Sequence, residues 1–340
     1  MSAITRRKFL LQATRFAAGA ALSGLGLVGQ LGCRQREQSL GTLVIQGASS
    51  PPSLALLRIA AQGVPSDLAQ AVRFEIWSTA DEMRARITSR QAHFSGVPVN
   101  VAATLYNRGI AVQLLSVYIW GILYLVTSDP RVSTWQDLRG QTVLIPFRGD
   151  LPDILTQYLL RRQGMNLATD LRPSYLSAAP EAAQLLAAGR ASHAVLSEPS
   201  ATLAILKAQE NGITLRRAID YSQAWAAATG RQPRIPMAGV VADPEIVRQH
   251  PRLLAWFQEA HRAAVSWVID HAAEAVQLGA QTIQAIPPAA MQASLPYIQF
   301  AFHEAAEVRE EIEFFLSEMY SLSPELIGGR LPPDAFYYRR

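Results

Sequence analysis

Short runs of β-branched and aromatic residues alternate along the chain with longer stretches in which apolar residues recur every three or four positions. The short runs predict strands and the longer stretches predict helices, because side chains repeat about every two residues in a strand and about every 3.6 residues in a helix. Regular alternation of the two favours a largely parallel sheet covered by helices. We therefore predict an α/β fold.

The predicted elements form two consecutive sets. The first set has strands at Thr42–Gln46, Val72–Trp77, His93–Gly96 and Val112–Val117 and helices at Ser53–Gln62, Ala80–Ser89 and Asn100–Asn107. The second has strands at Thr142–Ile145, Leu171–Tyr175 and His193–Leu196 and helices at Pro152–Arg162, Pro180–Ala188 and Ala201–Gln209. The peptide Arg90–Pro98 is echoed by Arg190–Pro199, so we expect two lobes of similar construction.

The remainder of the chain contains one predicted strand, Met237–Ala242, and then only helical patterns, at Pro251–Asp270, Ala272–Ile283 and Phe302–Tyr320. One strand cannot build a third sheet, so we expect it to return to the first lobe. The chain then passes between the lobes twice, near Gly121–Thr127 and near Met237–Ala242, and two crossing segments form a hinge. We predict lobe 1 from residues 42–120 and 240–340 and lobe 2 from residues 126–236.

The first 33 residues have the parts of a bacterial export signal. The twin arginine Arg6-Arg7 precedes a charge-free, glycine-rich run, Phe16–Gly32, which resembles the signal of the twin-arginine route for folded cargo. Cys33 follows a small residue and resembles the cysteine that is lipidated in bacterial lipoproteins. We predict an export signal at 1–33, lipidation at Cys33 and a polar linker at 34–41.

This signal places the protein on the periplasmic or cell-surface side of the inner membrane, held by the lipid on Cys33. The alternatives are a retained membrane anchor and a signal that is cleaved without lipidation. An anchor would leave Arg34 and Arg36 on the far side of the membrane, against the tendency of basic residues to stay inside.

The composition narrows the classes of partner. Four basic residues and no acid in the first 33 residues account for the whole formal net charge of +4, so the rest of the chain is formally neutral. Nucleic-acid binding requires a basic face, so we exclude that partner. The chain has one cysteine, which excludes an internal disulfide, a cysteine-rich zinc site and an iron–sulfur cluster.

Candidate ligand-binding residues follow the predicted strands, because ligands of parallel sheets bind beyond the carboxyl ends of the strands. They are Ser49, Ser50, Trp77, Ser78, Thr79, Pro98, Asn100, Tyr118, Phe147, Arg148, Ser177 and Glu198. We expect free N–H groups after Gly47 to hold a ligand oxygen, aromatic rings to offer flat faces, and the guanidinium of Arg148 to clamp an oxyanion.

Three of these residues have an alternative structural role. Arg148 suits a turn in which it pairs with Asp150, Trp77 suits lobe packing, and Glu198 suits the N-terminus of the next helix. No catalytic residue, cofactor or metal site is predicted, since the chain has no hydrolase motif and its six histidines lack metal-ligand spacing. His93 and His193 begin strands, where we expect structural roles.

Residues 41–270 resemble the substrate-binding proteins of bacterial ABC importers, in the nitrate, sulfonate and taurine class that shares its fold with thiamine-pyrimidine-precursor binding proteins. The segment Trp135–Val143 is similar to that family's sequence at the start of the second lobe. The helix end Leu159–Gly164, the segment Leu186–Gly189 and the pair Glu198-Pro199 add to the likeness.

The resemblance implies a two-lobed periplasmic-binding-protein fold of type II-like construction, which closes about a hinge on a small molecule. The ligand would be a sulfonate, nitrate or taurine-like oxyanion or a heteroaromatic compound, passed unchanged to an ABC permease in the inner membrane. Two alternatives use the same fold: an enzyme, such as a cofactor-precursor synthase or a dehydratase, and a sensory binding module.

Overall fold

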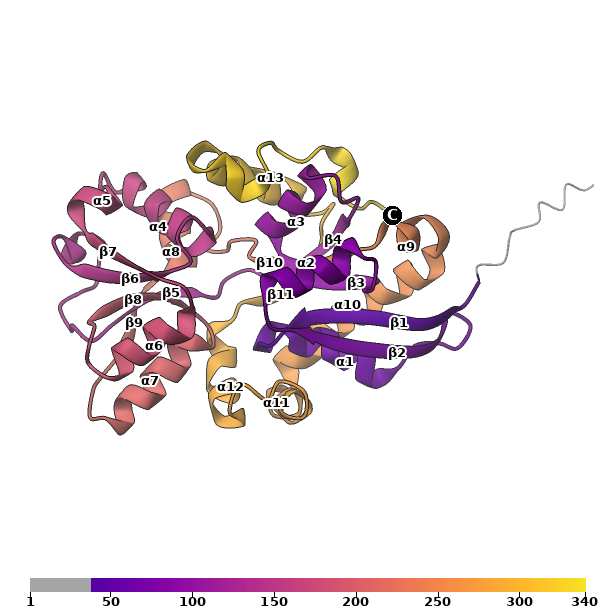
Figure 1. The fold of residues 1–340 in the computed structure, drawn as a ribbon, viewed down its shortest axis with the longest axis horizontal. Coiled ribbons are helices and arrows are strands. Elements are labelled where there is room, and N and C mark those ends of the chain that lie inside the picture. Colours follow the sequence, from indigo (N-terminus) through magenta and orange to yellow (C-terminus); the bar gives the residue numbers. More distant parts are fainter. Residues whose placement is uncertain (1–37) are drawn as a thin grey trace, which may run out of the picture. The chain divides into compact units, whose positions relative to one another are not determined.

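The computed structural model describes residues 38–340, whose strands form two separate sheets (Figure 1). The predicted export signal, the lipidation site Cys33 and most of the linker lie outside the described residues. Sheet 1 has the strand order β11-β4-β10-β3-β1-β2 and sheet 2 the order β7-β6-β8-β5-β9. The predicted α/β fold with two sheets is confirmed.

Sheet 1 is built from two distant parts of the chain. Its strands are β1 (Leu40–Ala48), β2 (Ala69–Trp77), β3 (Phe94–Pro98), β4 (Gln113–Ile119), β10 (Ala238–Ala242) and β11 (Phe300–Glu304). The strand β1 pairs in parallel with β2 and β3, whereas β10 runs antiparallel between β3 and β4. The late strand β10 therefore returns to sheet 1, as the sequence predicted.

Sheet 2 uses one continuous part of the chain. Its strands are β5 (Leu123–Thr127), β6 (Thr142–Pro146), β7 (Arg172–Leu176), β8 (His193–Ser197) and β9 (Arg216–Asp220). The strand β6 pairs in parallel with β7 and β8, and β5 runs antiparallel between β8 and β9. Each sheet thus holds a parallel core and one antiparallel strand, β10 or β5, supplied by the segment that arrives from the other sheet, and sheet 1 has a second antiparallel strand, β11, at its edge beside β4.

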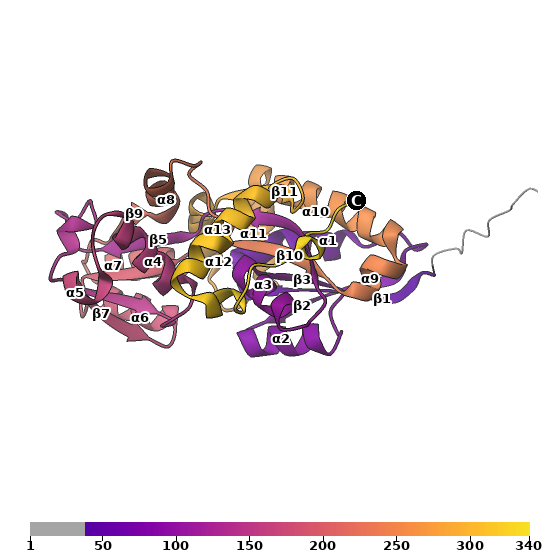
Figure 2. The ribbon, with the colours of Figure 1, turned by 90° about the horizontal axis from the view of Figure 1, so that it is seen from above.

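Helices cover both faces of each sheet (Figures 1 and 2). Around sheet 1 lie α1 (Leu54–Gln62), α2 (Ala80–Thr88), α3 (Val99–Asn107), α9 (Pro244–Gln249), α10 (Pro251–Asp270), α11 (Ala272–Ala280) and α12 (Pro288–Ser294). Around sheet 2 lie α4 (Leu151–Arg162), α5 (Leu167–Asp170), α6 (Ala179–Ala187), α7 (Ser200–Glu210) and α8 (Tyr221–Thr229). The last helix, α13 (Arg309–Leu322), packs against α4.

The chain passes between the sheets at residues 120–122 and returns at residues 230–237, and the two segments are hydrogen-bonded to each other. Ile235 N donates to Trp120 O (2.6 Å) and Met237 N donates to Ile119 O (2.9 Å). A third segment joins them, because Gln299 N donates to Gly121 O (2.8 Å) and its carbonyl accepts from Trp120 N (2.9 Å).

Two predictions for the C-terminal part are wrong. The helix expected at Phe302–Tyr320 is a strand, β11, followed by a turn and α13, so the part of the chain after residue 236 contains two strands. Phe300 and Phe302 alternate with smaller residues and pair with β4, whereas the sequence was read with a helical period across the turn. The strand β9 was not predicted, because it is half-exposed and has few apolar residues. The helices α5, α8, α9 and α12 were not predicted either. All the other predicted strands and helices are present, with small differences at their ends.

Candidate functional site

The loop after β1 has fewer free donors than its sequence suggests. The amides of Ser49 and Ser50 donate to the carbonyls of Trp77 (3.2 Å) and Ala48 (2.8 Å), and the next two residues are prolines, which have no N–H. The expectation that free N–H groups of this loop hold a ligand oxygen is therefore wrong. Both serines are half-exposed, so their hydroxyl groups remain available.

The loop after β2 is closed by an acidic side chain. Glu82 accepts a hydrogen bond from Ser78 N (2.8 Å), and its own amide donates to Thr79 Oγ1 (3.2 Å) at the N-terminus of α2. This reciprocal arrangement satisfies donors that would otherwise face a ligand. Trp77 is half-buried and packs against the core, as its structural alternative predicted, yet its buried indole Nε1 has no hydrogen-bond partner among the described residues.

Asn100 lies in the first turn of α3, after Pro98 at the end of β3. Its side chain is buried and its Oδ1 has no hydrogen-bond partner within residues 38–340. On β1, Gln46 donates to Ser95 Oγ (2.8 Å) but leaves its own buried Oε1 without a partner in the same part of the chain. A buried polar atom without a partner costs about 1–3 kcal/mol, so these atoms mark places where water or a ligand can bind.

Tyr118 lies in the core of sheet 1 and not among the loops. It is 2% exposed, its ring meets His261 of α10 edge-on (4.8 Å between centroids), and burial raises the pKa of its phenol. Trp225 of α8 is also buried and packs beside Tyr158. Both residues therefore pack in the interior and do not offer a ring to a ligand.

The loop after β6 presents an exposed aromatic ring. Phe147 is 43% exposed and has φ +60°, in the left-handed region that a residue with a Cβ rarely occupies. Its amide donates to Leu176 O (2.9 Å), and its carbonyl accepts from Asp150 N (3.0 Å), which together hold this conformation. Such backbone strain is typical of ligand-binding and catalytic positions.

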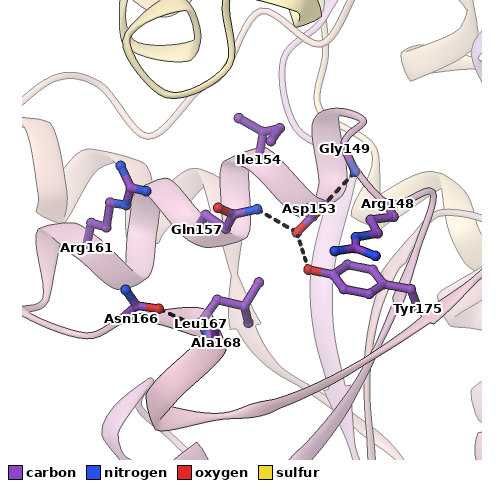
Figure 3. Close-up of a pocket in the computed structure, with 10 residues that line it drawn as sticks. All are labelled: Arg148, Gly149, Asp153, Ile154, Gln157, Arg161, Asn166, Leu167, Ala168 and Tyr175. Carbon is purple, nitrogen blue, oxygen red and sulfur yellow. Dashed lines mark hydrogen bonds between the residues drawn. The ribbon is translucent and has the colours of Figure 1, made fainter.

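Arg148, the next residue, forms no ion pair within the described chain, and its guanidinium lies 5.0 Å from the centre of the Tyr175 ring (Figure 3). Asp150 does not pair with it; its carboxylate accepts from Leu151 N (2.7 Å) at the start of α4. Asp153 accepts from Gly149 N (2.8 Å). The N-terminus of α4 is therefore closed by two carboxylates, and Arg148 is the cationic group available in this loop.

A cavity of about 340 Å³ opens beside Arg148 between α4, α5 and β7 (Figure 3). Asp153 lies at its base and also accepts hydrogen bonds from Gln157 Nε2 (3.0 Å) and Tyr175 Oη (3.2 Å). Sequence reasoning missed this acid; its signal was a second Asp three residues after Asp150 at a helix start. Arg161 and Tyr175 were missed as well.

The two remaining candidates differ in exposure. Ser177 is exposed, with its Oγ 3.5 Å from Glu181 Oε2. Glu198 is buried and accepts from the amide (3.1 Å) and hydroxyl (2.7 Å) of Thr202 in α7 and from Arg217 Nε (2.7 Å). Burial raises the pKa of Glu198, and Arg217 opposes that shift. Glu198 therefore lies where its structural alternative predicted, at the N-terminus of the next helix.

Two histidines at strand starts have structural roles, as expected. His93 Nδ1 accepts from Val44 N (2.9 Å), and His193 Nδ1 is 2.8 Å from Thr127 Oγ1. Within residues 38–340 no group of three or more His, Cys, Asp or Glu side chains is placed to hold a metal ion. In the same range, none of the helices combines the length and the apolar character that crossing a membrane requires.

No protein-family model and no curated protein matches the sequence. The fold matches solved structures. A structure described as an ABC transporter, from Parabacteroides distasonis, is 24% identical with a TM-score of 0.73, covering 88% of this chain and 99% of that one. The periplasmic aliphatic sulphonate binding protein SsuA from Escherichia coli is 13% identical with a TM-score of 0.65, covering 88% and 93%.

The periplasmic nitrate-binding protein NrtA from Synechocystis PCC 6803 is 13% identical with a TM-score of 0.59, covering 85% and 84%. The structural neighbours are thus periplasmic binding proteins of the sulfonate and nitrate class, the class that the sequence resembles. The two-lobed binding-protein fold is confirmed for this chain.

Proposed function

We propose that this protein is the extracytoplasmic substrate-binding component of an ABC importer, which captures a small molecule between two lobes and delivers it to a permease in the inner membrane. The observation that carries the proposal is the binding-protein fold over 88% of the chain. In this proposal residues 42–120 and 240–340 form lobe 1, around sheet 1, and residues 126–236 form lobe 2, around sheet 2.

The ligand lies against the loops that follow the strands. The residues assigned to it are Ser49, Ser50, Trp77, Ser78, Thr79, Pro98, Asn100, Phe147, Arg148 and Ser177. Tyr118 and Glu198 are left out because they are buried in hydrogen-bonded or apolar surroundings. Closure depends on how much better the closed lobes bind the ligand than the open ones, and no bond of the ligand is made or broken.

The geometry limits how an oxyanion is held. The helix starts after β1, β2 and β6 use their donors internally, so in these three loops a nitrate or sulfonate group is held by the guanidinium of Arg148. The start of α6 after β7 differs, because its N-cap residue Ala178 has no side-chain cap. A heteroaromatic ligand instead uses Phe147, together with the unpartnered Nε1 of Trp77 and Oδ1 of Asn100. Both ligand classes therefore belong in the test.

A thermal-shift screen of the mature protein against sulfonates, nitrate, carboxylates and pyrimidines tests this function. A ligand should raise the melting temperature, and Arg148→Ala should remove the effect of an anionic ligand, whereas the exposed Arg172 on β7 provides the matched control Arg172→Ala. Absence of binding by every compound would contradict capture, and turnover of a compound by the purified protein would favour the enzyme alternative.

We further propose that residues 1–33 direct export and that Cys33 is lipidated. The support is the twin arginine before the glycine-rich run and the small residue before the cysteine. Wild-type protein should fractionate with membranes and carry an acyl mass, and Cys33→Ser should be released in soluble form. Membrane association that survives Cys33→Ser would point to the retained-anchor alternative.

A further inference from the structure

We propose that the pocket between α4, α5 and β7 binds a small organic dianion, with one anionic group held by Arg148 and the other by Arg161. This goes beyond the proposed function, because every residue that lines the pocket belongs to lobe 2 (Figure 3). The site is complete within one lobe and does not depend on closure of the hinge.

The wall formed by α4 presents polar side chains along one side of the helix. Asp153, Gln157 and Arg161 recur every four residues and therefore share a face. Across from them lie Asn166 and Leu167, and the ring of Tyr175 lies near Arg148 (Figure 3). The spacing places the two arginines at opposite ends of the pocket.

The free charges in this pocket are positive. Both oxygens of Asp153 accept hydrogen bonds, Oδ2 from Gly149 N and Oδ1 from Gln157 and Tyr175, so this buried carboxylate needs no further partner. Arg148 and Arg161 form no ion pair within residues 38–340. Two guanidinium groups without counter-ions in that range therefore line the pocket together with one acid that is already satisfied.

The dimensions suit a short chain with an anionic group at each end. The helix rises about 15 Å from Leu151 to Arg161, and flexible arginine side chains shorten the gap between their ends. The volume of about 340 Å³ fits a small ligand. The planar guanidinium matches carboxylate and phosphate alike, and Ile154 and Leu167 offer apolar contact to the carbons between them.

Titration calorimetry of the full protein with glutarate and adipate tests the site, with butyrate and hexanoate as singly charged controls and 3-phosphonopropionate as a carboxylate–phosphonate probe. The dicarboxylates should bind at least about tenfold more tightly than the monocarboxylates. Arg161→Ala and Arg148→Ala should each weaken dicarboxylate binding by about tenfold or more. Tighter binding of the phosphonate would assign one end to a phosphoryl group and still support two anionic ends.

Two control variants locate the site. Arg172→Ala removes an exposed arginine outside the pocket, and Trp77→Phe removes the indole N–H of lobe 1; both should leave dicarboxylate affinity unchanged. Equal affinity for monocarboxylates, an unchanged affinity in Arg161→Ala, or no binding of any probe would overturn the proposal. Loss of affinity in Trp77→Phe would do so too, because the ligand would then lie between the lobes. Circular dichroism of each variant verifies that it is folded.

Discussion

Phe147 and Arg148 were found from sequence because they follow a recognisable strand, whereas other site residues depend on contacts that the sequence does not reveal. Tyr118 also follows a strand pattern, but only the packing of α10 decides that its side chain is covered. Asp153 looks like an ordinary helix-start acid until Tyr175, from a different element, is seen to donate to it. The place of a residue along a strand can be predicted from the sequence, whereas the side chains that it contacts in the folded protein cannot.

The strained backbone of Phe147 leads to a stability prediction. Glycine occupies φ +60° without a Cβ clash, so Phe147→Gly should be more stable than Phe147→Ala by about 1 kcal/mol, the two variants having lost the same exposed ring. Urea unfolding of both proteins measures the difference. Equal stability would mean that the left-handed conformation carries no strain here.

His261 gives a prediction for pH. Burial lowers the pKa of His261 to about 3, from 6.5, so the unfolded chain takes up a proton near pH 6.5 and the folded chain does so only near pH 3. Acid therefore favours unfolding, and the free energy of unfolding should fall as the pH drops from about 6.5 towards 3, by up to about 1.4 kcal/mol per pH unit from this group.

The variant His261→Phe keeps a ring beside Phe257 and cannot be protonated, so its stability should depend less on pH over that range. Denaturant unfolding at several pH values gives the slope of the free energy of unfolding against pH for the wild type and for the variant. Burial also lowers the pKa values of His93, His193 and His303, so part of the slope should remain. An unchanged slope would show that His261 is not protonated on unfolding.

At the scale of elements, sheet 1 depends on a close approach between β10 and β4. The pairing is irregular on either side of Gly239, and a Cβ placed there would lie 2.3 Å from the backbone oxygen of Ser116. The sequence predicted both β10 and β4. The register in which these two strands pair, and the need for glycine at position 239, become visible only when the strands lie side by side. The same is true of β11, whose alternation is clear once β4 lies next to it.

Gly239→Ala should therefore lower the free energy of unfolding by about 1–3 kcal/mol, because backbone cannot move aside as a flexible side chain can. Gly41→Ala is the matched control, since nothing lies within 4 Å of a Cβ at that position, and it should change stability by less than about 0.5 kcal/mol. Thermal or urea unfolding measures both. Similar values for the two variants would contradict the close approach.

At the scale of the whole described chain, the C-terminal segment contacts elements of both sheets. Tyr297 stacks on Arg217 of β9, with 3.4 Å from the guanidinium to the ring centre, and its carbonyl accepts from Tyr124 Oη of β5 (2.8 Å). Further along, Phe314 of α13 packs on Trp225 of α8 (5.7 Å between ring centres). The lobes are thus joined by more than the two crossings that the sequence predicted.

Substitutions at Arg217 and Tyr297 should measure two contributions to stability separately, that of the stacked ring and that of the ion pair with Glu198. Tyr297→Ala removes the ring but keeps the backbone carbonyl, and it should cost about 0.5–2 kcal/mol. Arg217→Ala also leaves the buried carboxylate of Glu198 without its cation, and it should cost about 3–5 kcal/mol. Urea unfolding distinguishes them, and equal losses would mean that Glu198 is not held by Arg217.

The strand order of the two sheets has a consequence for synthesis on the ribosome. All the strands of sheet 2 have been made once residue 220 is reached, whereas sheet 1 lacks a strand between β3 and β4 until residues 238–242 emerge and its outer strand until residues 300–304. The N-terminal half of sheet 1 must therefore wait, incompletely paired, while a later part of the chain folds. Sheet 1 can therefore be completed only after residue 304 has been made, so this sheet reaches its final pairing near the end of translation.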